Sequence, residues 1–330
     1  MLATRLFATG DLRTVDVPVP EPRPGEVLVR VEAAGLCGTD RHLFKGEFPC
    51  TPPVTLGHEF SGIVVGRGTG ATIPEGTRVT CDPNIACGTC DQCHRGRVNL
   101  CRNLVAIGIH RDGGFAEYAA IPAHRAFVLP ADLDPHHGAF CEPLACTLHG
   151  IDLAAIRAGA RVTVLGGGVI GLLALQLAVM AGAEVMLVTR QKAKRDLAAS
   201  LGAAATAGSV AEATALWPDG ADAVLECAGV GDTVAKAPRL TRAGGRIVIL
   251  GVLPKGEQVA VEPFDLLFRE IAVLYSFLNP FSQSRAADLI AKGGIRIDPL
   301  ISRRVGLADL PDAIARDPRP GEVKVLAVPG

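Results

Sequence analysis

The chain has 330 residues, of which 48% are hydrophobic and 20% are charged. This length suits about two domains of roughly 150 residues each, and the composition excludes a disordered or fibrous protein. The net charge of −1 argues against nucleic acid or an anionic membrane surface as the main partner.

The first 130 residues are rich in Gly, Pro and Val, and short apolar runs at 27–31 and 63–65 alternate with turn residues. This pattern predicts an irregular β-barrel rather than repeated helices. Charged residues interrupt the N-terminal segment at Arg5, Asp11 and Arg13, so it has no apolar core of the kind that signal peptides carry. We therefore expect a cytoplasmic protein.

Within this part, four of the ten cysteines fall inside fifteen residues: Cys87, Cys90, Cys93 and Cys101. In a reducing compartment such a cluster binds metal more often than it forms disulfides. Four thiolates on one short loop complete a closed tetrahedron, which predicts a structural zinc ion. An iron–sulfur cluster and unliganded thiols are the alternatives.

Other residues with metal-binding chemistry are dispersed: Cys37 within Gly-Leu-Cys-Gly-Thr-Asp, the pair His58-Glu59, and Glu142 before a proline. Their spacing does not join them into one site. Each also has a plain structural interpretation, as a core thiol, a buried polar group or a helix cap.

From residue 161 apolar runs alternate with helical stretches, which predicts a parallel sheet with helices on both faces, the doubly wound Rossmann α/β fold. We expect strands at 162–165, 184–189, 222–227, 246–250 and 271–277, a weaker one near Ala203, and helices at 169–181, 192–201, 209–216 and 232–241. Residues 162–183 carry no charge and could span a bilayer. The glycines inside this run favour a strand, a turn and a buried helix instead, so we expect no membrane partner.

The tail adds an expected helix at 285–292 and a strand at 323–328, whose β-texture resembles that of the first part. We therefore expect a discontinuous first domain over 1–142 and 278–330, with the Rossmann domain over 143–277.

The expected first Rossmann strand leads into a motif of the form G-x-G-x-x-G, which opens a helix. In this context the motif predicts a dinucleotide site, with pyrophosphate at the helix N-terminus. The glycines supply a tight turn, backbone access for the pyrophosphate and close helix–strand packing. The predicted contacts are Gly166, Gly168, Val169, Ile170 and Gly171.

The end of the second Rossmann strand lacks the acidic residue that binds the ribose 2′-hydroxyl of NAD. Thr189 and Arg190 occupy this place, and Arg195 follows in a basic segment. An arginine suits a 2′-phosphate because it donates two parallel hydrogen bonds. The sequence therefore favours NADP over NAD, while a solvated basic helix face is the alternative.

Jointly, these motifs resemble the zinc-dependent medium-chain dehydrogenase/reductase superfamily of alcohol and polyol dehydrogenases. The resemblance also rests on Gly57-His58-Glu59, on the segments 37–42 and 113–118, and on Cys141-Glu142-Pro143-Leu144. The likeness covers nearly the whole chain. It implies a GroES-like catalytic domain built from both chain ends and a Rossmann domain between them.

The resemblance assigns roles to the dispersed residues. Cys37 and His58 match catalytic zinc ligands, and Thr39 and His42 match a proton relay. Glu142 stands where the alcohol dehydrogenases have a cysteine ligand, which is similar to the sorbitol dehydrogenase branch. In that branch Glu59 can complete the zinc shell, so both glutamates remain candidates. We place further cofactor contacts at Leu250, Gly251, Ser276 and Phe277.

The expected function is hydride transfer between NADP(H) and a polyol, sugar alcohol or secondary alcohol, with two zinc ions per chain. The Arg-Tyr pair usual in sorbitol dehydrogenases is absent from 276–280, and Arg41, Lys45 and Arg111 are candidate contacts for a substrate phosphate. The alternatives are a threonine or aldose dehydrogenase, a zinc-free quinone or enoyl reductase, and a non-catalytic NADPH-binding scaffold. The apolar strand at 271–277 suggests a homodimer or homotetramer.

Overall fold

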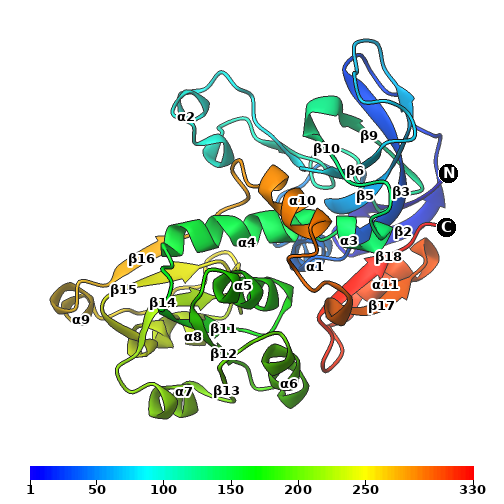
Figure 1. Cartoon of the computed structure of the whole chain (residues 1–330). Helices are drawn as coiled ribbons and strands as arrows, with labels where there is room; N and C mark the ends of the chain where they lie inside the picture. The colour runs from blue at the N-terminus through cyan, green and yellow to red at the C-terminus, as the bar shows by residue number, and fades with distance from the viewer. The chain divides into compact units, whose positions relative to one another are not determined.

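The computed structural model describes all of residues 1–330, which form two compact units (Figure 1). The first unit comprises Met1–Ala145, Pro280–Pro318 and Lys324–Gly330, and the second comprises Cys146–Asn279 and Arg319–Val323. The segment Arg319–Val323, which the sequence analysis placed with the rest of the C-terminal part, thus groups with the second unit. There the Gly321 N–H donates a hydrogen bond of 2.8 Å to the side-chain oxygen of Gln191.

The first unit is mainly β-structure. Its strands are β1 (Leu2–Ala8), β2 (Asp11–Asp16), β3 (Glu26–Gly35), β4 (Val54–Thr55), β5 (Glu59–Arg67), β6 (Arg78–Cys81), β7 (Asn84–Ile85), β8 (Val105–Ala106), β9 (Tyr118–Pro122), β10 (Ala126–Val128), β17 (Ile301–Val305) and β18 (Lys324–Ala327). Its helices are α1 (Gly38–Lys45), α2 (Asp91–His94), α3 (Pro135–Gly138), α10 (Gln283–Ala291) and α11 (Leu310–Ala315), with short 3₁₀ turns η1 (Val98–Leu100), η2 (Ala123–Arg125), η4 (Asp298–Leu300) and η5 (Leu307–Asp309).

A seven-stranded sheet organises this unit, in the order β10-β6-β5-β3-β18-β17 with β9 also paired to β3. The strand β3 is its centre, because it pairs with β5, β9 and β18. Apolar side chains of β3, including Val27, Val29 and Val31, are almost fully buried in the core of the unit. The strand β18 comes from the end of the chain, so the C-terminal segment returns to the first unit as expected.

The second unit is a six-stranded parallel sheet in the order β13-β12-β11-β14-β15-β16. Its strands are β11 (Arg161–Leu165), β12 (Glu184–Val188), β13 (Ala205–Ala207), β14 (Ala221–Glu226), β15 (Thr241–Ile249) and β16 (Ala272–Tyr275). Its helices are α5 (Val169–Met180), α6 (Lys192–Ser200), α7 (Val210–Leu216), α8 (Gly231–Lys236) and α9 (Pro263–Phe268), with the 3₁₀ turn η3 (Ala237–Leu240). This strand order is that of a dinucleotide-binding Rossmann fold, which confirms the predicted fold class.

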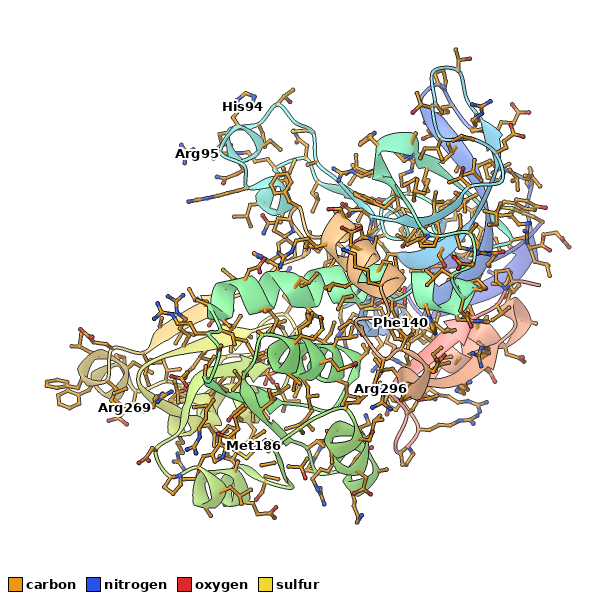
Figure 2. The ribbon with its side chains drawn as sticks, in the orientation of Figure 1. His94, Arg95, Phe140, Met186, Arg269 and Arg296 are labelled. Carbon is orange, nitrogen blue, oxygen red and sulfur yellow. The ribbon has the colours of Figure 1, made fainter.

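The central strands read as continuous apolar runs because helices cover both faces of a parallel sheet. Val162, Val164 and Leu187 are fully buried, as is Met186 of β12, labelled in Figure 2. The apolar run 162–183 divides into β11, a glycine turn and the 12-residue helix α5. None of the helices combines the length and the apolar character that a membrane-spanning helix needs.

Three local predictions need correction. The predicted helix 232–241 ends at Lys236, because Pro238 cannot continue it, and β15 already begins at Thr241. The helix α4 (Cys141–Ala154) was not predicted, although Pro143 falls within its first turn, where no backbone N–H is needed. The helix α1 was not predicted either, because its apolar residues are too few to give a clear period.

Candidate active site

The first ligand candidate, Cys37, lies between β3 and α1. It is the N-cap residue of α1, and its backbone N–H donates a 2.8 Å hydrogen bond to the carboxylate of Asp40. This bond fixes the turn that aims the thiol. The Sγ atom lies 3.6 Å from the hydroxyl oxygen of Thr39. The sulfur atom is therefore placed at the N-terminus of a helix, beside the Thr39 hydroxyl.

The second candidate, His58, follows a turn that only glycine can form. Gly57 has φ +93°, and a Cβ atom there would lie 2.7 Å from the ring of Phe115. The next two side chains are thereby directed inward, and His58 and Glu59 are buried. The Nδ1 atom of His58 and the Oδ1 atom of Asp40 lie 3.7 Å apart, and neither has a hydrogen-bond partner.

The fold brings three dispersed residues together. One donor atom each from Cys37, His58 and Glu59 lies within 4.8 Å of the other two. Burial alone would lower the pKa of His58, but the negative charges of Cys37, Asp40 and Glu142 outweigh it and raise this pKa well above its usual range. Thiolate, imidazole and carboxylate are the donor types that zinc takes in proteins. The orphaned Nδ1 atom and the surplus of acidic groups therefore fit a divalent cation.

Glu142 lies in the first turn of α4 and is buried. It acts electrostatically on His58 but does not belong to the group of mutually close donor atoms. Of the two glutamates that the sequence left open, Glu59 therefore lies among the mutually close donor atoms and Glu142 does not.

The two relay candidates lie three residues apart on α1, which places them on one face of the helix. The Nδ1 atom of His42 hydrogen-bonds the carboxylate of Glu47 at 2.6 Å, and its side chain is 26% exposed. Because Glu47 holds Nδ1, the ring presents Nε2 for other contacts.

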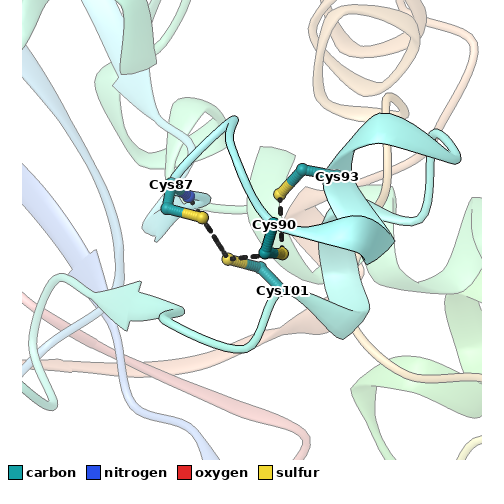
Figure 3. Close-up of side chains that lie close together, drawn as sticks. All are labelled: Cys87, Cys90, Cys93 and Cys101. Carbon is teal, nitrogen blue, oxygen red and sulfur yellow. Dashed lines mark hydrogen bonds between the residues drawn. The ribbon is translucent and has the colours of Figure 1, made fainter.

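The four-cysteine loop forms a second group of donors (Figure 3). Its Sγ atoms are separated by 3.5 Å between Cys87 and Cys101, 3.6 Å between Cys90 and Cys93, and 4.0 Å between Cys90 and Cys101. A tetrahedron with Zn–S bonds of about 2.3 Å has edges of about 3.8 Å. The thiols therefore already have the spacing of a closed zinc site.

Protonation in this loop also fits a metal. A hydrogen bond from the backbone of Thr89 is the largest of several that lower the pKa of Cys87 to about 5, whereas burial and neighbouring thiols raise that of Cys93 to about 12. Four adjacent thiols cannot all ionise without a cation, and zinc binding releases their protons. The loop carries α2, and Figure 2 labels its last residue, His94, and the C-cap residue Arg95.

In the second unit a cavity of about 620 Å³ opens at the carboxyl ends of the parallel strands. The glycine turn Gly166–Gly168 lines it, together with Thr189 and Arg190. At Gly171 a Cβ atom would collide with the carbonyl oxygen of Gly166, so this glycine permits the close helix–strand packing. Val169, Ile170 and Gly171 form the first turn of α5, directly beyond the cavity's glycine wall.

Charge in this cavity is positive where the sequence predicted it. Of its charged lining residues, Lys236 pairs with Asp232 at 2.7 Å, whereas the guanidinium of Arg190 makes no ion pair. Lys194, which the sequence analysis did not list as a contact, also lines the cavity. Burial lowers the pKa of Lys194, and Glu322 opposes this shift. The position of Lys194, four residues after Arg190, was the signal in the sequence that could have identified it as a cavity residue.

Arg195 is placed differently from Arg190 and Lys194. It does not line the cavity, and one of its Nη atoms donates hydrogen bonds of 2.8 Å to the carbonyl oxygens of Thr189 and Arg190. Arg195 thereby holds the backbone of the loop that presents Arg190.

The remaining predicted contacts also lie outside the cavity lining. Leu250 and Gly251 follow β15, and their N–H groups donate to the carbonyl oxygen of Glu226. Ser276 and Phe277 follow β16, and Phe277 is 45% exposed. All four lie beyond the carboxyl ends of their strands.

Comparisons with known proteins agree with this geometry. Residues 23–131 match the family model of the alcohol dehydrogenase GroES-like domain, and residues 169–292 match that of zinc-binding dehydrogenases. The chain is 33% identical to L-galactonate-5-dehydrogenase of Escherichia coli K12, over 91% of this chain and 90% of that protein. It is 34% identical to galactitol 1-phosphate 5-dehydrogenase of the same strain, over 97% of each. A solved structure from Sinorhizobium meliloti 1021, bound to NADP, is 59% identical over 99% of each chain, with a TM-score of 0.98.

Proposed function

The chain belongs to the zinc-dependent medium-chain dehydrogenase/reductase superfamily, and we propose that it oxidises a polyol or sugar alcohol reversibly with NADP. It is an oxidoreductase that acts on CH–OH groups. The observation that carries the finer proposal is the convergence of Cys37, His58 and Glu59, whose donor atoms lie within 4.8 Å of one another. A protein that only bound NADPH would not require this buried donor set.

The first unit would supply metal binding and proton transfer. Cys37, His58 and Glu59 would hold a zinc ion, which would supply a Lewis acid for the substrate oxygen, and the cavity of the second unit would hold NADP, which would supply the hydride acceptor. The Thr39 hydroxyl, 3.6 Å from Cys37 Sγ, would accept the proton of the alcohol as it gives up its own proton. His42 would receive that proton and release it to solvent, since its ring is held by Glu47 and partly exposed. A second zinc ion would serve the structure of the four-cysteine loop.

The preference for NADP rests on the cavity of the second unit. Arg190 and Lys194 bring two cationic groups to the strand end where NAD enzymes carry a carboxylate. The 59% identical structure that is bound to NADP supports the same preference. We assign the 2′-phosphate to Arg190 and Lys194, with Arg195 as the residue that holds the Arg190 loop in place.

Within the polyols, we propose an unphosphorylated substrate. Two of the basic residues that could meet a phosphate are already engaged: Arg41 donates to the carbonyl oxygens of Ile314 and Arg316, and Arg111 pairs with Glu26 at 2.7 Å. Both guanidinium groups thus have other partners, which leaves the exposed Lys45 as the third candidate contact for a phosphate. The relatives act on both kinds of compound by their names, which include a galactonate and a galactitol phosphate.

The decisive experiment is an absorbance assay of NADPH formation with the zinc-loaded protein. The panel should contain four- to six-carbon polyols, their phosphates, sugar acids, aldoses, 3-hydroxy amino acids and simple secondary alcohols, each with NADP and with NAD. We expect the highest kcat/KM for an unphosphorylated polyol with NADP. If only threonine or aldoses are turned over, the protein is a threonine or aldose dehydrogenase instead. No turnover of any alcohol or ketone by metal-replete protein would indicate the scaffold function.

We also propose a homodimer or a dimer of dimers formed through the second unit. The strand β16 is the edge of the six-stranded sheet, with its outer side unpaired. On and beside it, Phe264, Leu267, Phe268 and Tyr275 are each at least 67% exposed. An unpaired apolar edge of this kind is an aggregation hazard unless another chain covers it. Light scattering at micromolar concentration should give at least twice the mass of one chain, and a monomer would contradict the proposal.

A further inference from the structure

A buried ion pair joins two strands across a glycine beside the metal-binding group. In the main sheet β3 lies between β5 and β18, and Gly35 of β3 is paired with Glu59 and with Leu326. The ammonium of Lys324, from β18, contacts the carboxylate of Glu59, from β5. A Cβ atom on Gly35 would collide with that carboxylate and lie 2.7 Å from Lys324 Cε. The two side chains therefore meet in the space that Gly35 leaves.

The Glu59 carboxylate is shared between the lysine and the metal-binding group. Both side chains of the pair are 1% exposed, so water screens neither charge. The Oε2 atom accepts from Lys324, and a Glu59 oxygen also lies within 4.8 Å of the donor atoms of Cys37 and His58. Lys324 further interacts electrostatically with Cys37 and Asp40. The lysine thus acts on two of the three donors, Cys37 and Glu59, and on the neighbouring Asp40.

Stabilising the pairing of β18 with the sheet does not by itself explain why a buried ion pair is present here. Burying two charges costs about as much free energy as their attraction returns, and apolar residues of similar volume hold strands together at least as well. A buried ammonium has a specific consequence at this place. It repels a divalent cation in a site that water does not screen, and it competes for one oxygen of a ligand.

We propose that Lys324 is the resident counter-cation of the catalytic metal site and a positioning residue for Glu59. It balances the acidic donors, and it keeps Glu59 a weak ligand, so that the metal stays a stronger Lewis acid for a substrate oxygen in the open position. This inference rests on the proposed function, because it requires zinc at Cys37, His58 and Glu59.

The test is the zinc affinity of Lys324→Met, which removes the charge and retains most of the side-chain length. We expect the dissociation constant of the catalytic zinc, measured by chelator competition, to fall about tenfold or more, because a buried repulsion is removed. The absorption spectrum of the cobalt(II)-substituted protein should shift as Glu59 binds more fully. The value of kcat should fall while the dissociation constant for NADPH stays unchanged.

Val325→Ala is the matched control, since Val325 is the next residue of β18, is buried, and points to the opposite face of the sheet. It should lower stability without changing zinc affinity or the cobalt spectrum. An unchanged or weakened zinc affinity in Lys324→Met would show that the lysine only fastens the strand and would overturn the inference.

Should Lys324→Met fail to fold, the comparison moves to Glu59→Gln with and without Lys324→Met, because the double variant buries no unpaired charge. Tighter zinc binding in the double variant supports the inference, whereas equal or weaker binding overturns it. The proposed function fails separately. If Cys37→Ala in the otherwise unchanged protein leaves zinc content unaltered, zinc does not bind at this group at all.

Discussion

The two metal-binding groups of the first unit are built in opposite ways. The four cysteines lie within one loop of fifteen residues, are all of one donor type, and are mostly only partly buried. The other group takes Cys37 from the start of α1 and His58 and Glu59 from the start of β5, and it surrounds them with Asp40, Glu142 and Lys324. Its donors differ in kind, and charged neighbours act on them from several elements.

We propose that this difference separates a site that stabilises a loop from a site that performs chemistry. Four thiolates fill the coordination sphere of zinc and leave no position for a substrate. Three mixed donors leave one position open, and the charged neighbours tune how strongly each donor binds. Substitutions in the two groups should therefore have different consequences, which the following experiments measure.

The largest effect is expected at the mixed group. Cys37→Ala or His58→Ala should lower kcat/KM at least about a thousandfold. The reason is that a Lewis acid stabilises the transition state by several kcal/mol, and each 1.36 kcal/mol is about tenfold in rate. NADPH titration should give an unchanged dissociation constant, since every residue of the cofactor cavity belongs to the second unit. Near-normal turnover by either variant would rule out zinc catalysis.

The four-cysteine loop should respond in metal content and stability. In Cys90→Ser we expect metal analysis to find about one zinc ion per chain instead of about two, and thermal unfolding to begin at a lower temperature, because bound structural zinc contributes folding free energy. Turnover per remaining zinc ion should fall much less than in Cys37→Ala. Two retained zinc ions would contradict the assignment of a closed site to this loop.

How far the sequence predicts each group follows from the same difference. The cysteine loop is local, so its spacing alone indicates the donor set, and the structure places its sulfur atoms 3.5–4.0 Å apart. Cys37 and His58 are joined by the pairing of β3 with β5, which spacing does not reveal. Only the family resemblance brought them together, and it left Glu59 and Glu142 undecided.

Lys324 shows what the sequence could not supply. It lies 265 residues from Glu59 along the chain and sits in an apolar strand, where a lysine gives no local signal of its function. The helices α1 and α4 were missed for a related reason, since tertiary contacts and caps rather than a clear apolar period define them. The central Rossmann strands β11, β12 and β14, by contrast, are mostly buried apolar runs. The bounds of the Rossmann strands were predicted to within about two residues, except that β15 begins at Thr241, well before its predicted start at residue 246.

A smaller effect is expected for substitutions in the cofactor cavity. Arg190→Asp should weaken NADP binding by at least about tenfold, because a charge-assisted hydrogen bond contributes roughly 1.5–3 kcal/mol and repulsion of the phosphate adds to its loss. NAD binding should change little or improve. A wild-type protein that prefers NAD in kcat/KM would show that the basic segment is only a solvated helix face.

Two neighbouring variants separate charge from positioning in this loop. Lys194→Ala should weaken NADP and leave NAD nearly unchanged, because Lys194 lines the cavity and would act by its charge. Arg195→Ala should weaken both dinucleotides by a similar, smaller factor, because its hydrogen bonds hold the carbonyl groups of Thr189 and Arg190. An effect of Arg195→Ala on NADP alone would instead place its guanidinium on the phosphate.

The smallest effect is expected at Gly35 of β3, whose lack of a side chain leaves space for the side chains of Glu59 and Lys324. A Cβ atom there would displace the ends of Glu59 and Lys324, which are flexible, so Gly35→Ala should cost only about 1 kcal/mol of stability, the low end for an overpacked core. Because the displaced carboxylate is a proposed ligand, zinc affinity and the cobalt(II) spectrum should change as well. Gly66→Ala on β5 is the matched control: its Cβ atom would lie 3.5 Å from Leu28, an ordinary contact, and should alter neither. If both variants leave the metal site unchanged, Glu59 is not held at the metal through the space above Gly35, and the third ligand must be sought at Glu142.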